Sequence, residues 1–364
     1  MISVDDLTEE IPIVLVDDAP DQDDQPKRKI HGLSTDERIE YAVALASGVH
    51  LALLVRLLLD WDDLMGTSLL AVVAFIAVHF LIVRSSSSAE VALDKCVTTV
   101  MWTIGVLIVA VLLWMVAFVT IRGMKQLSLS FLQEDMRTVS ALDEGGGAYH
   151  AIIGTIEQVG IATLAVVPVA ILTAVYLHEI KGRMAGLIRF IVDALSGLPS
   201  IVAGLLIFTI WPHPAGIKAS AALLILAIPI VTRGAEEVLR TVSDGLRESS
   251  LALGAPQWRM IMKVVLPTAQ AGLLTVTLLA VARMVGETAP VILTAFGNSA
   301  TNYDVFHGNQ ASLSLFVYDL IRVPDQLSND RAWAGALLLL ILVLIVFVAA
   351  RLALARSERR LGRR

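Results

Sequence analysis

The strongest constraint on this chain is a series of long apolar runs separated by short polar stretches. Several runs approach or exceed the roughly 20 residues that a helix needs to cross a bilayer. Of the 364 residues, 56% are hydrophobic and only 17% are charged, a balance that a soluble domain rarely shows. The sequence therefore predicts an all-α, polytopic membrane protein.

The apolar runs predict about eight transmembrane spans. They cover residues 41–59, 64–83, 97–121, 152–178, 188–211, 217–232, 267–285 and 332–353. Arginines gather after the last span, at Arg351, Arg356, Arg359, Arg360, Arg363 and Arg364. Because Lys and Arg accumulate on the cytoplasmic side of a membrane, we expect the C-terminus inside. With eight spans the N-terminus is then also cytoplasmic, as are the loops 179–189 and 233–265.

The formal charge of −6 comes from one end of the chain. Residues 1–26 hold nine acids and no Lys or Arg, so the remainder carries about +3. Residues 1–38 are expected to form a disordered acidic cytoplasmic tail, and residues 356–364 a basic one. Nothing in this pattern points to nucleic acid. The lone Cys96 excludes an intramolecular disulfide and any cysteine-based metal cluster, and we expect no metal site.

A polar elbow interrupts the apolar pattern at about residues 243–266. Residues 243–253 are rich in helix formers, and Gly254 is expected to end that helix in the left-handed conformation. A second helix is expected to start near Pro256 and to carry Trp258, Ile261 and Val264 on one apolar face. An apolar face outside the membrane predicts a soluble partner, unless the elbow is only an amphipathic surface loop.

The elbow resembles the signature of binding-protein-dependent ABC importer permeases. That signature is E-A-A, three residues, G, nine residues, I or V, any residue, L-P. Here the matching residues are Glu248, Ser249, Ser250, Gly254, Val264, Leu266 and Pro267, with serines in place of the two alanines. The resemblance implies that the elbow is a coupling helix that docks into an ATPase subunit. The residues implied in docking are Glu248, Ser249, Ser250, Leu253, Gly254, Ala255 and Trp258.

Other stretches resemble the phosphate-specific permeases of the PstA subfamily. They are "AIIGTI" (151–156), "AVYLHE" (174–179), "GLPSIVAGL" (197–205) and "VARMVGETAPVILTA" (281–295). The resemblance covers about residues 97–355 and implies a six-span permease domain. Residues 39–96 then form two extra transmembrane helices, which have no role in the family pattern.

The same resemblance implies an assembly in a bacterial plasma membrane. The expected partners are a PstC-like permease, two PstB-like ATPase subunits and an extracytoplasmic phosphate-binding protein. ATP and magnesium would bind the ATPase subunits, and this chain would bind no cofactor. No G-x-x-x-x-G-K-[ST] motif appears in the chain, so we expect a transport subunit and not an enzyme.

Arg283 and Glu287, followed by Thr288, are the leading candidates for the substrate path. Their spacing of four residues predicts one helix face, and ionisable groups at membrane depth usually face a polar cavity or each other. The planar fork of Arg suits phosphate, and Glu can accept the proton of hydrogen phosphate. The alternative interpretation is a structural ion pair, or residues that snorkel to the interface.

Two weaker candidates extend this path. Arg233 either attracts an anion at the cytoplasmic exit or is an ordinary positive-inside anchor. Ser200 lies where Gly197 and Pro199 interrupt a span, a pattern that fits either a broken helix beside an anion path or a simple kink. Transport of sulfate or molybdate, and a membrane scaffold or sensor role without conduction, remain alternatives to phosphate import.

Overall fold

The computed structural model describes residues 34–140 and 143–360, and these residues are almost entirely helical. Apart from an isolated bridge between Phe296 and Gln310, the described ranges contain no strand. The all-α prediction is therefore confirmed. The chain divides into two compact units at Val111–Leu112, which we call the N-terminal unit and the C-terminal unit and describe separately.

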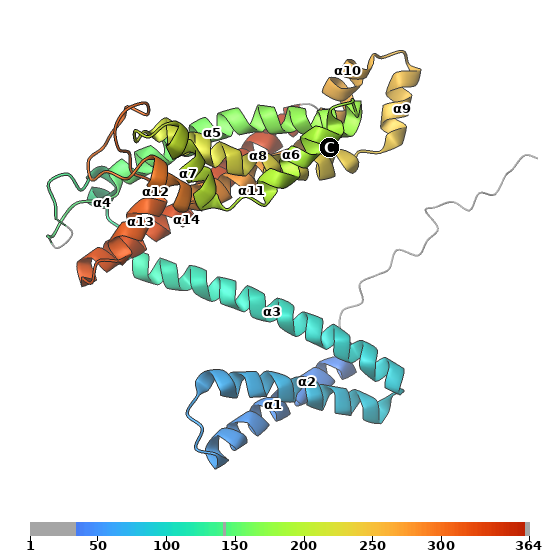
Figure 1. Cartoon of the computed structure of the whole chain (residues 1–364). Helices are drawn as coiled ribbons and strands as arrows, with labels where there is room; N and C mark the ends of the chain where they lie inside the picture. The colour runs from blue at the N-terminus through green and yellow to red at the C-terminus, as the bar shows by residue number, and fades with distance from the viewer. Residues whose placement is uncertain (1–33, 141–142, 361–364) are drawn as a thin grey trace, which may run out of the picture. The chain divides into compact units, whose positions relative to one another are not determined.

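Figure 1 shows the helices in chain order, with longer connections between α4 and α5 and between α12 and α13. The N-terminal unit holds α1 (Thr35–Leu58), α2 (Leu64–Ser86) and the first part of α3 (Ala89–Gly123). The C-terminal unit holds the end of α3 and then α4 (Leu129–Gln133), α5 (Tyr149–Val175), η3 (Tyr176–Ile180), α6 (Ala185–Ser196), α7 (Ser200–Ile210), α8 (Gly216–Arg240), α9 (Asp244–Ala252), α10 (Gln257–Met260), η4 (Ile261–Val265), α11 (Leu266–Gly286), α12 (Ala289–Thr294), α13 (Leu313–Ile321) and α14 (Gln326–Arg360).

Seven described helices are long and apolar enough to cross a membrane, and a bent pair brings the number to eight. The bent pair is α6 and α7, which meet at 106°. The sequence predicts one span over 188–211, whereas the structure breaks it at Gly197–Pro199. Proline lacks the N–H that would continue the helix, and the residue before it avoids helical geometry. The sequence predicts a short span at 217–232, whereas the structure has a longer helix there, α8.

The sequence predicts an acidic tail at the N-terminus and a basic tail at the C-terminus. The acidic tail lies outside the described residues up to position 33. Ser34 then caps α1: its hydroxyl accepts from the N–H of Glu37, whose carboxylate accepts from the N–H of Ser34. This capping box starts the helix at Thr35, before the apolar run begins. Residues 361–364 of the basic tail also lie outside the described residues.

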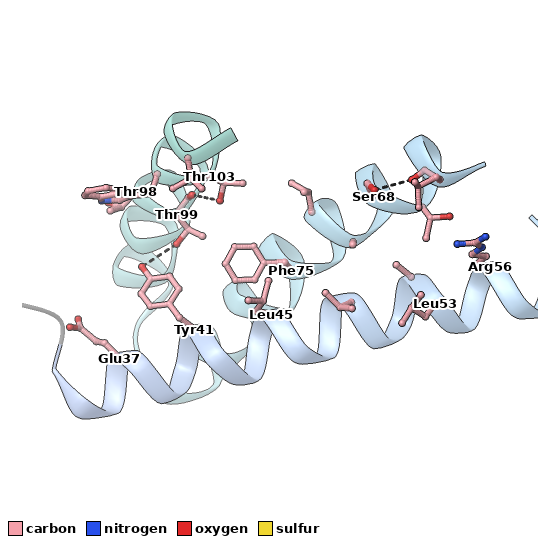
Figure 2. Close-up of a pocket in the computed structure, with 18 residues that line it drawn as sticks. Glu37, Tyr41, Leu45, Leu53, Arg56, Ser68, Phe75, Thr98, Thr99 and Thr103 are labelled. Atoms are coloured by element: carbon pink, nitrogen blue, oxygen red, sulfur yellow. Dashed lines mark hydrogen bonds between the residues drawn. The ribbon is translucent and has the colours of Figure 1, made fainter. Parts of the chain in front are cut away.

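In the N-terminal unit, polar contacts tie α1 to α3 beside an apolar cavity of about 990 Å³. The hydroxyl groups of Tyr41 and Thr99 lie 3.3 Å apart (Figure 2). The Thr99 hydroxyl also lies 3.2 Å from the Nδ1 atom of His79. Lys95 lies 3.3 Å from Glu37 and 3.5 Å from Glu40. These contacts hold the three helices as one unit around the cavity.

In the C-terminal unit, α5 and α8 pack along their length through small residues. Ala162, Val166 and Ala170 of α5 meet Ala219, Leu223, Ala227 and Val231 of α8 in one buried cluster. α11 also approaches α8 closely, since a Cβ on Gly234 or on Gly272 would lie 2.4–2.5 Å from a valine of the other helix. Small side chains let helix backbones approach, which is the usual route to tight packing in lipid.

Candidate functional site

The elbow is a helical hairpin at one end of the C-terminal unit (Figure 1), which we call the elbow end. α9 ends at Ala252, and Gly254 has a φ of +79°, the left-handed conformation that glycine adopts without strain. Pro256 then precedes α10, and η4 leads into α11, where Pro267 lies in the first turn. The predicted order of helix, glycine turn and second helix is confirmed.

The exposed apolar side chains of the elbow differ from those predicted. Trp258 is exposed, but Ile261 is buried at 7% and packs with Val175 of α5 and Leu239 of α8. The expectation that Trp258, Ile261 and Val264 share an exposed face is therefore wrong, because one turn of α10 already reaches the helix bundle. The exposed apolar residues are Leu246, Leu251, Leu253 (88%), Trp258 (60%) and Met262.

The residues implied in docking lie on or beside this surface. Glu248 and Ser249 are exposed on α9, while Ser250 and Ala255 are half-buried. The Ser249 hydroxyl donates to the carbonyl of Gly245 at 2.7 Å, so it is turned back onto its own helix. The structure thus brings the residues implied in docking together on one hairpin with Leu253 and Trp258 exposed.

One ion pair anchors the elbow to α5 through its extension η3. The Nη2 atom of Arg247 donates to Oε1 of Glu179 at 2.9 Å, and the Nε atom donates to the same carboxylate at 3.2 Å. Their side chains are only 12% and 5% exposed. Arg247 also donates to the carbonyls of Leu239 at 2.8 Å and Val242 at 2.5 Å. Sequence reasoning missed Glu179, because its partner lies 68 residues away.

Arg283 and Glu287 form an ion pair at the end of α11 farthest from the elbow. The Nε atom of Arg283 lies 3.3 Å from Oε1 of Glu287. α11 ends at Gly286, so Glu287 already has extended backbone, and Thr288 leads into α12. The Arg283 side chain is 60% exposed and that of Glu287 is 17% exposed. The guanidinium is thus accessible from outside this chain while it contacts the carboxylate.

Glu287 and Thr288 are positioned by two neighbouring segments. The Ser314 hydroxyl of α13 donates to the carbonyl of Glu287 at 3.0 Å. In the following α12, Pro290 packs directly on Gly204 of α7. Ser200 starts that same α7 directly after its N-cap residue, Pro199. Two separate motifs, "GLPSIVAGL" and "GETAPVIL", therefore meet in space.

Arg233 is held in a network of two arginines and two carboxylates near the elbow end of α8. Its Nη1 atom donates to Glu236 at 2.9 Å, and its Nη2 atom donates to Asp193. Arg189 donates to the other oxygen of Glu236 at 2.8 Å. The buried Glu236 carboxylate, 4% exposed, is thus flanked by two cations. Arg233 is already paired, so the anchor role has more support from this geometry than anion attraction does.

The sequence of this chain matches the model of a known protein family. The sequence model of the binding-protein-dependent transport system inner membrane components matches residues 166–363. This match covers more than half of the chain and includes the elbow and the Arg283–Glu287 pair. The chain belongs to this family.

Individual relatives of this inner membrane component carry more specific names. This chain is 41% identical over 264 residues to "Phosphate transport system permease protein PstA 1" of Mycobacterium tuberculosis. The aligned region covers 71% of this chain and 87% of that protein. The chain is 38% identical to the PstA protein of Pasteurella multocida over 66% of this chain and 87% of that protein.

Solved transporters are similar at lower identity. A methionine ABC transporter in an inward-facing conformation matches at 20% identity with a TM-score of 0.46, over 58% of this chain and 94% of that one. An amino acid ABC transporter matches at 18% identity with a TM-score of 0.42, over 58% and 92%.

The family match falls within the C-terminal unit of this inner membrane component. It begins at Val166 in α5 and includes the bent α6–α7 pair, the α8 network and α14. The N-terminal unit lies before the matched range. The part of the chain that matches this transport family, residues 166–363, thus lies within the C-terminal unit.

Proposed function

We propose that this chain is the permease subunit of an ATP-driven importer of inorganic phosphate. The observation that carries the proposal is the 41% identity to a named phosphate permease over 87% of that protein's length. Such extended similarity favours phosphate over sulfate or molybdate. It also favours a conducting subunit over a scaffold or sensor.

The Arg283–Glu287 pair supplies chemistry that suits this substrate. A guanidinium donates two parallel hydrogen bonds to a phosphate, and its charge offsets that of the anion. A carboxylate beside it accepts a hydrogen bond from a protonated phosphate oxygen, which sulfate lacks at neutral pH. With Arg283 60% exposed and paired to Glu287 at 3.3 Å, the anion displaces an existing counter-ion instead of entering an empty positive site. Thr288 adjoins the pair and adds a hydroxyl donor, and Ser200 is a further candidate on the path.

The elbow is the proposed attachment point of the ATPase. Leu253 and Trp258 offer an exposed apolar surface beside the exposed Glu248. In this arrangement a homologous PstC-like permease completes the path, two PstB-like subunits bind ATP and magnesium, and an extracytoplasmic protein delivers phosphate. The elbow and both termini lie in the cytoplasm of a bacterial cell. Closure of the ATPase pair on ATP moves the elbows and shifts the two permeases between inward-open and outward-open states.

The experiment that tests this function is transport by the purified complex in lipid vesicles. The complex is captured through this chain, its subunits are identified, and accumulation of radiolabelled phosphate is followed with and without ATP. Sulfate and molybdate serve as competing substrates. ATP-dependent phosphate accumulation that excess sulfate leaves unchanged supports the proposal. Accumulation of sulfate or molybdate instead, or a complex that hydrolyses ATP without moving any of the three anions, contradicts it.

A further inference from the structure

Arg247 and Glu179 do more than join two neighbouring segments. The Arg247 guanidinium on α9 contacts the Glu179 carboxylate of η3, the carbonyl of Leu239 in α8, and the carbonyl of Val242 just after α8. It also donates to the exposed Asp244 of the same helix at 3.0 Å. One side chain thus connects the elbow with both helices that form the main packed core.

The second arm of the elbow is tied to the same position. The Nε2 atom of Gln257, the first residue of α10, donates to the backbone carbonyl of Glu179 at 3.0 Å. Beneath it, Met260 and Ile261 pack with Val175 of α5 in a buried apolar cluster. Both arms of the hairpin therefore hold the end of α5, one through the side chain of Glu179 and the other through its main chain.

α5 continues from this joint to the opposite end of the C-terminal unit. Its 27 residues span about 40 Å at 1.5 Å per residue. There Gln158 donates to the side chain of Gln310 at 3.0 Å, and the N–H of Leu313 donates to Thr155 at 2.7 Å. A Cβ on Gly154 would lie 2.1 Å from the carbonyl of Ala311, so α5 and this segment are in direct backbone contact.

The segment held by α5 leads to the substrate-path candidates. It runs from Gln310 into α13, where the Ser314 hydroxyl donates to the carbonyl of Glu287. A continuous series of hydrogen bonds and packing contacts therefore links the elbow, α5, residues 310–314 and the backbone of Glu287. Packed helices of this kind shift between discrete arrangements, because close-packed cores do not deform continuously.

We propose that the Arg247–Glu179 pair is the joint through which the elbow drives α5, so that it couples ATP hydrolysis to reorientation of the path. This inference rests on the proposed function. The pair suits the task because a forked, largely buried ion pair fixes both distance and direction. Loss of the Glu179 charge leaves the largely buried Arg247 with the exposed Asp244 as its acidic partner, and loss of Arg247 leaves the buried Glu179 without its guanidinium. In either case the elbow moves without transmitting its displacement to α5.

The test compares transport with ATP hydrolysis in the assembled complex. We expect Glu179→Gln to retain co-purification of the ATPase subunits and ATP hydrolysis, while phosphate imported per ATP hydrolysed falls at least tenfold. Arg247→Met should do the same. If the two residues act through each other, the double variant should be no worse than either single variant. The matched control is Glu237→Gln, which breaks the exposed pair with Arg240 at 3.3 Å and should leave the ratio unchanged.

These outcomes distinguish a failure of the proposed coupling role of the Arg247–Glu179 pair from a failure of the proposed function. An unchanged ratio in an assembled Glu179→Gln complex overturns the joint, as does a double variant whose loss equals the sum of the two single losses. If the Glu179→Gln complex does not assemble, the test uses Arg247→Lys, which keeps the charge but loses the fork. A lowered ratio of phosphate imported to ATP hydrolysed in this variant supports the joint, and a normal ratio overturns it. Failure of the unmodified complex to import phosphate contradicts the proposed function instead.

Discussion

Gly204 of α7 lies against Pro290 of α12 so closely that a Cβ at position 204 would be 2.7 Å from the Pro290 Cα atom. This contact fixes the second arm of the bent α6–α7 pair against the segment that follows Glu287. Neither partner has a flexible side chain that could move aside, because the nearest atoms belong to backbone. The bend and the charged end of α11 are therefore mechanically connected.

Gly204→Val should consequently destabilise the protein and reduce uptake. Overpacking of this kind typically costs about 1–3 kcal/mol, and the thermal unfolding temperature of the purified complex should fall. Gly160→Ala is the control, since a Cβ at that position in α5 meets no atom within 4 Å. An unfolding temperature that is equal for both variants would show that α7 and α12 are not in contact.

Replacement of Arg283 should impair transport more than stability. Its side chain is 60% exposed, so Arg283→Gln should leave the unfolding temperature nearly unchanged. Hydrogen bonds to a charged group are worth about 1.5–3 kcal/mol, so phosphate uptake at low substrate concentration should fall by about ten- to hundredfold. Arg283→Lys, which keeps the charge without the planar fork, should lose less.

The control for this prediction is Arg240→Gln, which removes another exposed arginine that pairs with a nearby carboxylate, that of Glu237. Uptake kinetics over a range of phosphate concentrations provide the measurement. Wild-type uptake in Arg283→Gln would exclude this residue from the path and would favour a structural ion pair.

Gly254 offers a direct test of the turn in the elbow. At a φ of +79° a side chain with a Cβ costs roughly 1–2 kcal/mol, although the position is open to solvent. Gly254→Val should therefore speed amide hydrogen exchange over residues 244–265. The comparison variant is Gly245→Ala. Gly245 lies in α9, and a Cβ there meets no atom within 4 Å, so alanine should stabilise that helix and slow exchange. Faster exchange in both variants would contradict the different backbone roles of these two glycines.

The sequence predicts the helices and the elbow well because both depend on local physical chemistry. A run of apolar residues long enough to cross a bilayer requires a helix, whatever surrounds it. Gly254 and Pro256 likewise mark a turn through their own backbone preferences. The bend of 106° at Gly197–Pro199 is different. The interrupting residues are visible in the sequence, but the angle depends on the packing of α7 against α12.

The contacts of the charged residues are harder to predict, because they join distant parts of the chain. Nothing near Arg247 in the sequence identifies Glu179 as its partner, and nothing near Arg233 indicates Asp193. The Arg283–Glu287 pair was predictable, since four residues separate the two. Ile261 shows the opposite case: its helical spacing indicates an amphipathic face, while tertiary packing buries the side chain against α5 and α8.

The exposed apolar part of the elbow should be needed for association with the ATPase. Trp258→Ala removes a large side chain that is 60% exposed, so it should not disturb the fold of this chain. If Trp258 enters a pocket on the ATPase, the affinity should fall by more than tenfold, as is typical of buried aromatic residues at interfaces. Co-purification of the ATPase subunits measures this, with Leu187→Ala on the exposed side of α6 as control. Equal recovery of the complex from both variants would place the ATPase elsewhere.

The last prediction concerns Asp135, in the loop between α4 and α5. Partial burial raises the pKa of this carboxyl, but hydrogen bonds from the N–H groups of Arg137 and Thr301 and from the Thr301 hydroxyl outweigh it, so the pKa lies below its usual value. A lowered pKa in the folded state stabilises the fold above the unfolded pKa of about 3.9, and the stabilisation is lost as the pH falls through the folded value. Asp135→Asn should therefore speed hydrogen exchange at the N–H of Thr301 at pH 7, and the difference from the unmodified chain should disappear as the pH falls through the lowered folded pKa of Asp135. A difference that stays constant with pH would show that the charge of Asp135 does not hold this loop.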